Sequence, residues 1–337
     1  MSNIRLIVIG LTSHHTKHIF ALKSNTTINV VGVCDIDSRA AKEISEKFSN
    51  VPCYSDFRGA ISSLKPDVVF ISLPHDQYFK VVKFALENNI HIFKEKPFAR
   101  DLEEAKKIAE LFKKSSNKMM IVSQRRFHKT YVEAKHLLNS LGQVKFVFAT
   151  YCFNKPTSGW RKNKQKSGGG VIIDAGYHFI DLLLYYFGLP EVVKCKLLKL
   201  SDDPLCETED YAKIEFQYPH REIIQLILNR LSETKKEEIV IYGELGKLVV
   251  TKNEIELDLF DSGISKKITI ETDDFTEAYR QQYLSFFTSL SAKHPVCPSV
   301  KEGILNSLVI EACYLSANKN ASLVNIKDLI VLKGVNL

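Results

Sequence analysis

The sequence lacks a hydrophobic run long enough to cross a membrane, since no segment approaches the roughly 20 apolar residues of a transmembrane helix. The apolar run within its first ten residues is also too short for a secretory signal peptide. Its seven cysteines are odd in number, dispersed and never spaced C-x-x-C, which argues against a disulfide framework or a structural zinc site. These absences predict a protein of the reducing cytoplasm, without membrane association and without a metal.

A strong excess of one charge is missing as well. The chain carries 46 Lys and Arg against 39 Asp and Glu, a net charge of +7, and the basic residues are scattered. This excess favours anionic small molecules but is too small for a nucleic-acid-binding protein. Of the 337 residues 45% are hydrophobic and 25% charged, which is the composition of a globular protein, and about 150 residues per domain predicts two domains.

The first domain is expected to span residues 1–123 and to contain a parallel sheet. Short apolar runs alternate there with amphipathic stretches, the pattern of β-α-β units whose strands are buried on both faces. The runs lie at 4–10, 28–35, 67–74, 90–97 and 118–123, and predicted helices lie at 38–48, 76–88 and 101–114. Asp101 is expected to cap the last of these helices. We therefore predict a doubly wound α/β domain of the nucleotide-binding type.

The second domain, residues 124–337, has a different pattern. A helix at about 128–141 and an apolar strand precede a glycine-rich loop, and an apolar helix then runs from about 170 to 187. From 190 to about 271 the sequence reads as successive strands, and two helices follow at about 275–293 and 300–316. Consecutive strands joined by short turns indicate a mostly antiparallel sheet. We expect an α+β domain with helices on one face of this open sheet.

The first strand-to-helix turn is where a doubly wound domain binds a pyrophosphate, because glycines let the backbone approach and the helix offers free N–H groups. Of the G-x-G-x-x-G pattern only Gly10 is present, and Thr12 and His15 stand in the other two places. Thr12 and Ser13 still offer N–H and hydroxyl donors to a diphosphate. An ordinary turn fits this motif equally well.

The histidines at 14, 15 and 18 share a predicted helix start. Residues four apart on a helix share a face and can bind a metal together. No acidic or cysteine ligand lies nearby in the sequence, so we expect a polar helix start beneath a cofactor rather than a metal site.

Asp35 ends the second predicted strand, at the separation from the glycine turn where a carboxylate accepts hydrogen bonds from the adenosine ribose. The same carboxylate would repel a 2′-phosphate, and no arginine stands directly beside it, since Ile36 and Asp37 follow. We therefore expect NAD rather than NADP.

The fourth apolar run ends in Glu95-Lys96-Pro97, at the carboxyl edge of the sheet where open α/β folds place their ligands. An ammonium at Lys96 is suited to hydrogen-bond a substrate hydroxyl and to polarise it as hydride leaves. An exposed loop lysine is the plainer alternative.

An imidazole and carboxylates stand together on the apolar helix after the triple glycine 168–170. At 100° per residue, Asp174, His178 and Asp181 share one helix face. An imidazole, whose ordinary pKa is about 6.5, is a natural acceptor for the proton of an alcohol, and a neighbouring carboxylate orients it or binds substrate. A core histidine satisfied by a carboxylate is the alternative. The triple glycine favours function, because such a loop lets backbone approach a ligand.

Taken in order, these motifs resemble those of the Gfo/Idh/MocA oxidoreductases over nearly the whole chain. The pair formed by E-K-P and D-x-G-x-H-x-x-D at this separation is the specific part of the resemblance. The full set comprises the turn at Gly10, Asp35, Leu73 to His75, Glu95 to Pro97, Gln124 to Phe127, Trp160-Arg161, Gly168 to Gly170 and Asp174 to Asp181.

The resemblance implies a Rossmann domain that binds a nicotinamide cofactor and a C-terminal domain whose open sheet forms the interface of a homodimer or homotetramer. It implies catalytic roles for Lys96, Asp174 and His178, with His178 as the acid/base. The implied cofactor-binding residues are Gly10, Thr12, Ser13, His14, Asp35, Ser72, Leu73, Pro74, His75, Glu95 and Lys96. The implied substrate-binding residues are Lys96, Arg126, Trp160, Asp174 and His178.

The chain departs from the family at Thr12 and His15, where members usually keep a glycine and often a small residue. The Cβ of Thr12 would crowd the pyrophosphate unless the turn shifts outward. The sequence favours an NAD-dependent dehydrogenase that oxidises a secondary alcohol of a sugar, sugar derivative or cyclitol, or catalyses the reverse reduction. Two alternatives stay open. One is a glycosidase of the same fold that uses transient oxidation by tightly held NAD, and the other is a non-catalytic protein that senses sugars or nucleotides.

Overall fold

The computed structural model describes residues 3–10, 15–219, 222–260, 263–270, 275–291 and 294–335, without the side chain of His15. Its chain forms two compact units. Unit 1 comprises Met1–Gln124 and Asp274–Ile304, and unit 2 comprises Arg125–Asp273 and Leu305–Leu337. The division expected from the sequence, at residue 123, differs in one respect, because the segment 274–304 belongs to unit 1.

Unit 1 is built on a six-stranded parallel sheet in the order β3-β2-β1-β4-β5-β6. The strands are β1 (Ile4–Ile9), β2 (Ile28–Cys34), β3 (Cys53–Tyr54), β4 (Val68–Ile71), β5 (His91–Lys94) and β6 (Met119–Ile121). The helices are α1 (His15–Lys23), α2 (Ser38–Lys47), α3 (Phe57–Leu64), α4 (Tyr78–Glu87), α5 (Leu102–Lys113) and α9 (Thr276–Ser291). The strand order reverses between β1 and β4, which confirms the predicted doubly wound Rossmann architecture.

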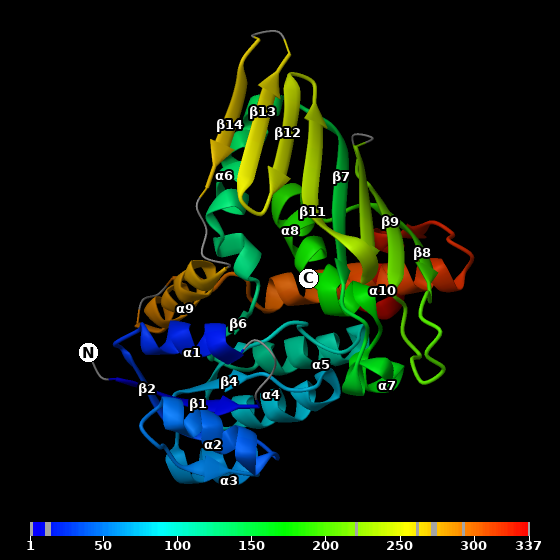
Figure 1. The fold of residues 1–337 in the computed structure, drawn as a ribbon. Coiled ribbons are helices and arrows are strands. Elements are labelled where there is room, and N and C mark those ends of the chain that lie inside the picture. The colour runs from blue at the N-terminus through cyan, green and yellow to red at the C-terminus, as the bar shows by residue number, and fades with distance from the viewer. Residues whose placement is uncertain are drawn as a thin grey trace. The chain divides into compact units, whose positions relative to one another are not determined.

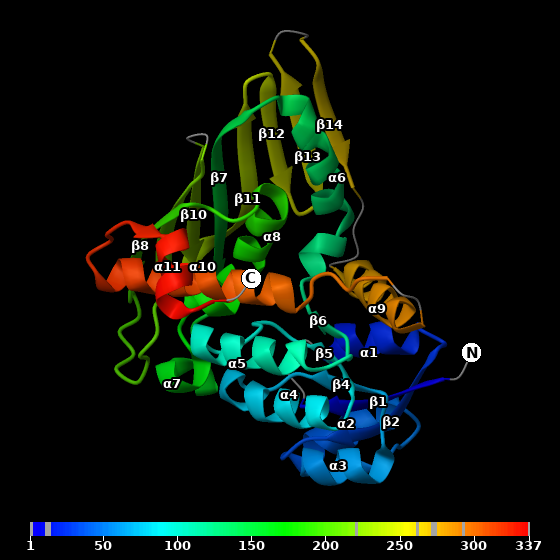
Figure 2. The ribbon, with the colours of Figure 1, turned by 180° about the vertical axis from the view of Figure 1, so that it is seen from behind.

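Local sequence explains where these helices begin. The side chains of Asp37, Asp56 and Asp101 accept hydrogen bonds from backbone N–H groups in the first turns of α2, α3 and α5, as N-caps do. The cap predicted at Asp101 is thus confirmed. Figure 2 shows α3, α4 and α5 along the sheet, and the rings of Phe57 in α3 and Phe84 in α4 lie 5.7 Å apart.

Unit 2 contains a nine-stranded sheet in the order β14-β13-β12-β11-β7-β10-β9-β8-β15 (Figure 1). Only β10 and β7 pair in parallel, so the sheet is mostly antiparallel, as predicted. Its strands are β7 (Val144–Asn154), β8 (Val192–Leu198), β9 (Tyr211–Gln217), β10 (Ile223–Asn229), β11 (Leu231–Gly243), β12 (Gly246–Thr251), β13 (Glu254–Leu259), β14 (Ser265–Thr269) and β15 (Val324–Asn325).

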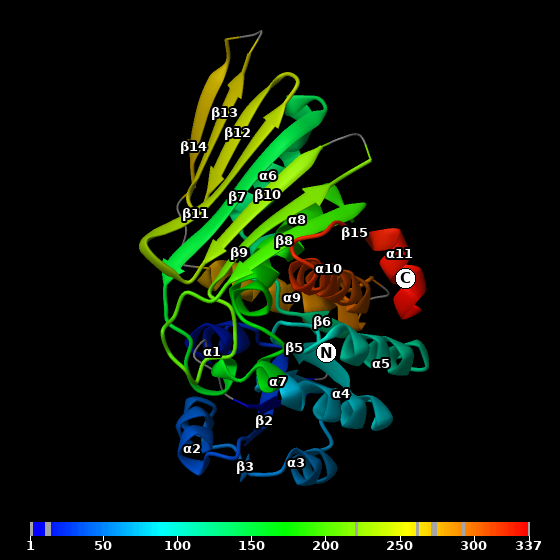
Figure 3. The same ribbon diagram turned by 90° about the vertical axis from the view of Figure 1, so that its right-hand side faces the viewer.

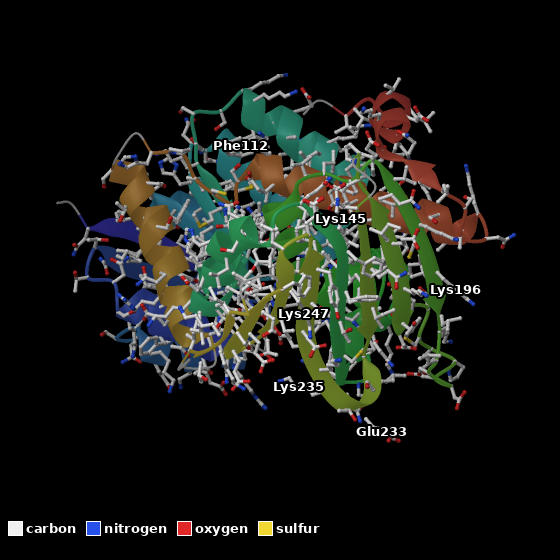
Figure 4. The ribbon with its side chains drawn as sticks, turned by 90° about the horizontal axis from the view of Figure 1, so that it is seen from above. Phe112, Lys145, Lys196, Glu233, Lys235 and Lys247 are labelled. Atoms are coloured by element: carbon white, nitrogen blue, oxygen red, sulfur yellow. The ribbon has the colours of Figure 1, made fainter. Side chains whose placement is uncertain are left out.

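The sheet of unit 2 has one covered and one open face. Alternate residues of the central strands are fully buried, under the helices that line this face in Figure 3. These are α6 (Lys129–Leu137), α8 (Tyr177–Phe187) and the part of α10 (Val300–Asn318) from Leu305 onward, and α7 (Lys164–Ser167) and α11 (Ile326–Lys333) complete the unit. The open face carries Phe148, 45% exposed, together with Lys196 and Lys247, which Figure 4 labels on β8 and β12.

Several elements were not predicted from the sequence. The helix α3 and the two-residue strand β3 lie between the predicted helix 38–48 and the next strand, and α11 follows the last predicted helix. The helix expected from about 170 to 187 begins as a π turn, Ile172–Gly176, before α8. Within the described part of the chain, one stretch, Lys164–Phe187, has the length and composition to cross a membrane. Of its apolar window 67% is buried inside the protein, and core helices of soluble proteins pass the same test.

Candidate active site

The carboxyl ends of the strands bring the predicted cofactor residues of unit 1 to one edge of the sheet. Backbone hydrogen bonds join neighbouring strand ends there, from Gly10 N to Cys34 O (2.8 Å), from Ser72 N to Ile9 O (2.9 Å) and from Glu95 N to Ile71 O (2.8 Å). Open α/β sheets bind ligands at this edge, next to the point where the strand order reverses. The sheet therefore aligns the loops after β1, β2, β4 and β5 as the sequence predicted.

Gly10 is required by the geometry of this edge. Its φ is +77°, and a Cβ at this position would lie 2.3 Å from the backbone oxygen of Ser72 and 2.5 Å from Cδ2 of Leu73. Only glycine accommodates both conditions. Thr12, Ser13 and His14 lie outside the described residues, so the predicted departure from the glycine pattern stays a prediction.

Asp35 directly follows β2 at the same edge. Its backbone N–H donates to the oxygen of Tyr54 at 3.0 Å, and its Oδ1 accepts from the N–H of Asp37 at 2.9 Å. The carboxylate is thus oriented by the start of α2. A carboxylate fixed at the end of the second strand is the acceptor that ribose hydroxyls need, so the residues present fit a dinucleotide.

The loop after β4 holds the remaining predicted cofactor residues. Ser72 and His75 are buried, whereas Leu73 and Pro74 are half-buried. The ring of His75 stacks on Tyr78, with centroids 5.8 Å apart. His75 is therefore packed against α4 within unit 1.

Lys96 lies in a loop that the rest of unit 1 holds firmly. Its N–H donates to Oε2 of Glu95 at 3.1 Å, and its carbonyl accepts from the hydroxyl of Tyr78 at 3.2 Å. The side chain of Lys94 is completely buried beneath the loop and donates to three further carbonyls. Lys96 itself is half-buried. The sequence analysis selected Lys96 and missed Lys94, although Lys94 directly precedes the Glu95-Lys96-Pro97 motif.

The side chain of Glu95 belongs to a buried network with His18. Nε2 of His18 lies 2.7 Å from Oε1 of Glu95, and Nδ1 lies 2.8 Å from the hydroxyl of Tyr283 in α9. The ring of His18 also packs on Phe70, with centroids 4.6 Å apart. His18 thus orients Glu95 from inside the unit. No sequence signal singled out this contact, because its three polar members lie far apart in the chain.

The triple glycine of unit 2 has an internal explanation. A Cβ at Gly169 would lie 1.9 Å from the hydroxyl of Tyr314, and one at Gly170 would lie 2.1 Å from the backbone oxygen of Glu209. The buried Glu209 carboxylate accepts from the N–H groups of Gly170 (2.8 Å) and Ile172 (3.2 Å) and from Tyr314 (2.9 Å). Burial raises the pKa of Glu209, and these donors oppose the shift. The sequence-based interpretation, in which the glycines let a ligand approach, is corrected: Tyr314 and Glu209 fill that space.

Asp174 lies on the π turn and is held by two arginines. Arg230 Nη2 donates to Oδ2 at 3.1 Å, and Arg161 Nε lies 3.5 Å from Oδ1. The Arg230 side chain is 2% exposed, while that of Asp174 is 25% exposed. The guanidinium of Arg161 lies 4.5 Å from the ring centroid of Trp160. Trp160 and Asp174 are therefore linked through Arg161, and Arg230 is a member of the cluster that the sequence did not reveal.

His178 follows in the first turn of α8 and is half-buried. The prediction placed Asp174, His178 and Asp181 on one helix face at 100° per residue, but the wider π turn precedes His178. His178 and Asp181 therefore have different environments, since His178 is half-buried and the Asp181 side chain is only 2% exposed. π turns are frequent at functional sites.

Asp181 forms a buried ion pair with Arg126. Nε and Nη2 of Arg126 donate to the two carboxylate oxygens, both at 2.8 Å, and the amide of Asn306 donates to Oδ1 at 3.0 Å. The guanidinium also lies 4.9 Å from the ring centroid of Tyr185. These contacts of Arg126 lie within unit 2 and stabilise the position of α8, which carries both Asp181 and Tyr185.

Across the ranges that the structure describes, no three His, Cys, Asp or Glu side chains form a group that would hold a metal ion.

The predicted catalytic residues are divided between the two units. Lys96 belongs to unit 1, and Asp174 and His178 belong to unit 2.

Comparison with known protein families decides what this arrangement belongs to. Residues 4–123 match the model of the oxidoreductase family with an NAD-binding Rossmann fold, and residues 135–326 match its C-terminal α/β domain. The chain belongs to the Gfo/Idh/MocA oxidoreductase family. Its first domain is thus an NAD-binding Rossmann domain, as the residues at the sheet edge predicted.

Relatives of this oxidoreductase include enzymes that act on sugars and cyclitols. It is 27% identical to D-glucoside 3-dehydrogenase of Escherichia coli over 57% of this chain and 56% of that one. It is 24% identical to inositol 2-dehydrogenase of Salmonella typhimurium over 92% and 93% of the two chains. An uncharacterised oxidoreductase of Schizosaccharomyces pombe is 32% identical over 51% of this chain and 48% of its own. The match thus spans about half the length of two of these relatives.

Solved structures confirm the fold of the oxidoreductase. Levoglucosan dehydrogenase in complex with NADH and levoglucosan has a TM-score of 0.89 at 20% identity, covering 96% of this chain and 100% of that one. An oxidoreductase from Thermotoga maritima has a TM-score of 0.87 at 22% identity, covering 97% and 99%.

Proposed function

We propose that this oxidoreductase is an NAD-dependent dehydrogenase of a secondary alcohol in a sugar, sugar derivative or cyclitol, working in either direction. The observation that carries the proposal is the fixed loop that presents Lys96 at the cofactor edge of the Rossmann sheet. The sugar and cyclitol dehydrogenases among its relatives supply the substrate class. Asp174 on the π turn and His178 on α8 supply the second set of polar groups.

The proposed mechanism divides the work among three residues. NAD held at the sheet edge by Gly10, Asp35 and the loop after β4 would supply the acceptor for a hydride from the carbinol carbon. The ammonium of Lys96 donates a hydrogen bond to the substrate oxygen and stabilises the charge that develops on it. A ring nitrogen of His178 takes the hydroxyl proton. Asp174, held between Arg161 and Arg230, binds a neighbouring substrate hydroxyl.

The remaining predicted residues have subsidiary places in this proposal. Gly10, Thr12, Ser13 and His14 contact the diphosphate, Asp35 binds the adenosine ribose, and residues 72–75 line the adenine side. Glu95 lies near the nicotinamide ribose and Trp160 borders the sugar. Arg126 acts through Asp181, because its guanidinium is engaged there. Selection of NAD over NADP rests on Asp35.

We also propose a homo-oligomer that forms through the open face of the nine-stranded sheet, on which Phe148 and Tyr242 are 45% and 37% exposed. All seven cysteines are free thiols, which supports placing the enzyme in the reducing cytoplasm.

The test begins with calorimetric titration of the cofactor-free protein with NAD and with NADP, followed by a screen of polyols and sugars for NADH formation. Lys96→Ala and His178→Ala should each lower kcat by roughly 10²- to 10⁴-fold, as loss of a proton-transfer or oxyanion group does, with the Kd for NAD unchanged. Lys107→Ala and His136→Ala, at exposed positions of α5 and α6, serve as matched controls. Unchanged kcat in both site variants would refute the mechanism.

Two other outcomes of the same screen identify the alternatives. Cleavage of a glycoside without net NADH formation would identify the glycosidase. Failure to bind either dinucleotide, with binding of a sugar retained, would identify the sensor.

A further inference from the structure

The four residues from Glu95 to Phe98 have all their carbonyl oxygens bound by side-chain donors. Nζ of Lys94 donates to the oxygens of Glu95 (2.8 Å), Pro97 (2.5 Å) and Phe98 (3.2 Å). The hydroxyl of Tyr78 donates to the oxygen of Lys96, which lies between them, at 3.2 Å. Two side chains from β5 and α4 therefore hold the whole loop around Lys96.

Lys94 is suited to this task because it is a buried ammonium with three N–H groups. Its side chain is 0% exposed, and its three acceptors match the three donors of an ammonium. Nζ also lies 3.7 Å from the centroid of the Tyr78 ring, close enough for a cation–π contact. Tyr78 thus contacts the loop with its hydroxyl and Lys94 with its ring.

Burying a charge at this position costs free energy, so the presence of a lysine here instead of an apolar residue must be explained. Burial lowers the pKa of Lys94 to about 7, and the carboxylates of Glu95 and Glu104 act in the opposite direction. An apolar side chain would avoid this cost, but it would leave three carbonyls beneath the loop without their donor.

We propose that Lys94 and Tyr78 are positioning residues that fix the backbone of Lys96, and so set where its ammonium meets the substrate oxygen. This inference rests on the role proposed for Lys96. Neither residue touches the reacting atoms. Their effect comes through the loop, because a misplacement of about 1 Å at a catalytic group costs roughly 10²-fold in rate.

The test compares Lys94→Met and Tyr78→Phe with two matched controls that lose the same chemistry elsewhere. Lys118→Met removes a lysine that donates to the carbonyls of Ser289 and His294 in unit 1. Tyr186→Phe removes a hydroxyl that donates to the carbonyl of Tyr131 in unit 2. For each variant we would measure kcat, KM, the Kd for NAD, the melting temperature and the deuterium isotope effect on kcat with substrate labelled at the carbinol carbon.

We expect kcat to fall by at least tenfold in Lys94→Met and severalfold in Tyr78→Phe, with the Kd for NAD within twofold of wild type. The isotope effect should rise in both, because a misplaced Lys96 makes hydride transfer more rate-limiting. Loss of folded protein alone would lower kcat and leave the isotope effect at its wild-type value. The two controls should keep both quantities.

Lys96→Ala separates failure of this inference from failure of the proposed function. If Lys96→Ala keeps wild-type turnover, the proposed mechanism fails and the inference fails with it. If Lys96→Ala is inactive while Lys94→Met and Tyr78→Phe keep the wild-type kcat and isotope effect, the mechanism stands and the inference is overturned. Should Lys94→Met not fold, Tyr78→Phe decides, because it removes a single oxygen atom and leaves the ring under Lys94.

Discussion

The ion pair between Arg126 and Asp181 gives a quantitative test of what the last aspartate of the D-x-G-x-H-x-x-D motif does. Both side chains are nearly inaccessible, at 7% and 2% exposed, and two hydrogen bonds of 2.8 Å join them. Removing one partner of such a pair leaves a buried charge without compensation and costs roughly 3–5 kcal/mol. In a unit of this size, at roughly 2–4 °C per kcal/mol, the melting temperature should fall by about 10 °C.

The assay is a double-mutant cycle on the full chain. Arg126→Met and Asp181→Asn should each lower the free energy of unfolding by about 3 kcal/mol or more. The double variant should lose less than the sum of these two values, because it leaves neither charge buried without its partner. Asparagine keeps an acceptor for Asn306, which bonds Asp181 at 3.0 Å. Wild-type stability of Arg126→Met combined with a large rise in KM for the sugar would refute this reasoning and place Arg126 on the substrate.

Three further predictions concern backbone space, protonation and assembly. Gly170→Ala should lower the free energy of unfolding by about 1–3 kcal/mol, because its Cβ would lie 2.1 Å from Glu209 O, whereas Gly59→Ala, whose Cβ has no neighbour closer than 3.8 Å, should not. The pKa of Lys94 in the folded protein is about 7, below its ordinary 10.5, so the unfolded chain binds more protons than the folded chain between these values. The free energy of unfolding of wild type, relative to that of Lys94→Met, should therefore increase as the pH rises from about 7 to about 10. A difference that stays constant with pH in urea unfolding would contradict this. Phe148→Asp, on the open sheet face, should shift the protein to monomers in light scattering, and an unchanged mass would remove this face from the proposed interface.

The sequence predicts the Rossmann sheet well because its strands are buried on both faces. The residues of β4 are all buried, and such continuous apolar runs have one simple interpretation. The helix α3 escaped prediction because its eight residues, FRGAISSL, include a glycine and two serines and form a single short amphipathic segment. Its start is nevertheless marked by Asp56, which accepts from the N–H of Gly59. An N-cap search over 48–67 would have found it.

The candidate site is harder to predict, because its supporting contacts join distant segments. Arg230 and Asp174 are 56 residues apart in the chain, and Arg126 and Asp181 are 55 apart. Neither pair has a sequence spacing that indicates contact. Lys94 illustrates a second difficulty, because a lysine at the end of an apolar run reads as the exposed end of a strand. Its side chain is covered instead by the Tyr78 ring of α4 and by the loop that follows β5.

Burial separates the groups proposed to react from the groups that hold them. Lys96, Asp174 and His178 are all half-buried, whereas Lys94, Glu209 and Asp181 are buried. Each of the buried three is charged in its ordinary state. Lys94 binds the carbonyls on either side of Lys96, Glu209 binds the N–H of Gly170 shortly before Asp174, and Asp181 binds Arg126. Because a buried charge is costly unless its hydrogen bonds are made, such groups restrict the local backbone to one arrangement. Within each unit these charged residues hold the backbone near a group proposed to react, so we expect variants at Lys94 to alter turnover more than the binding of NAD.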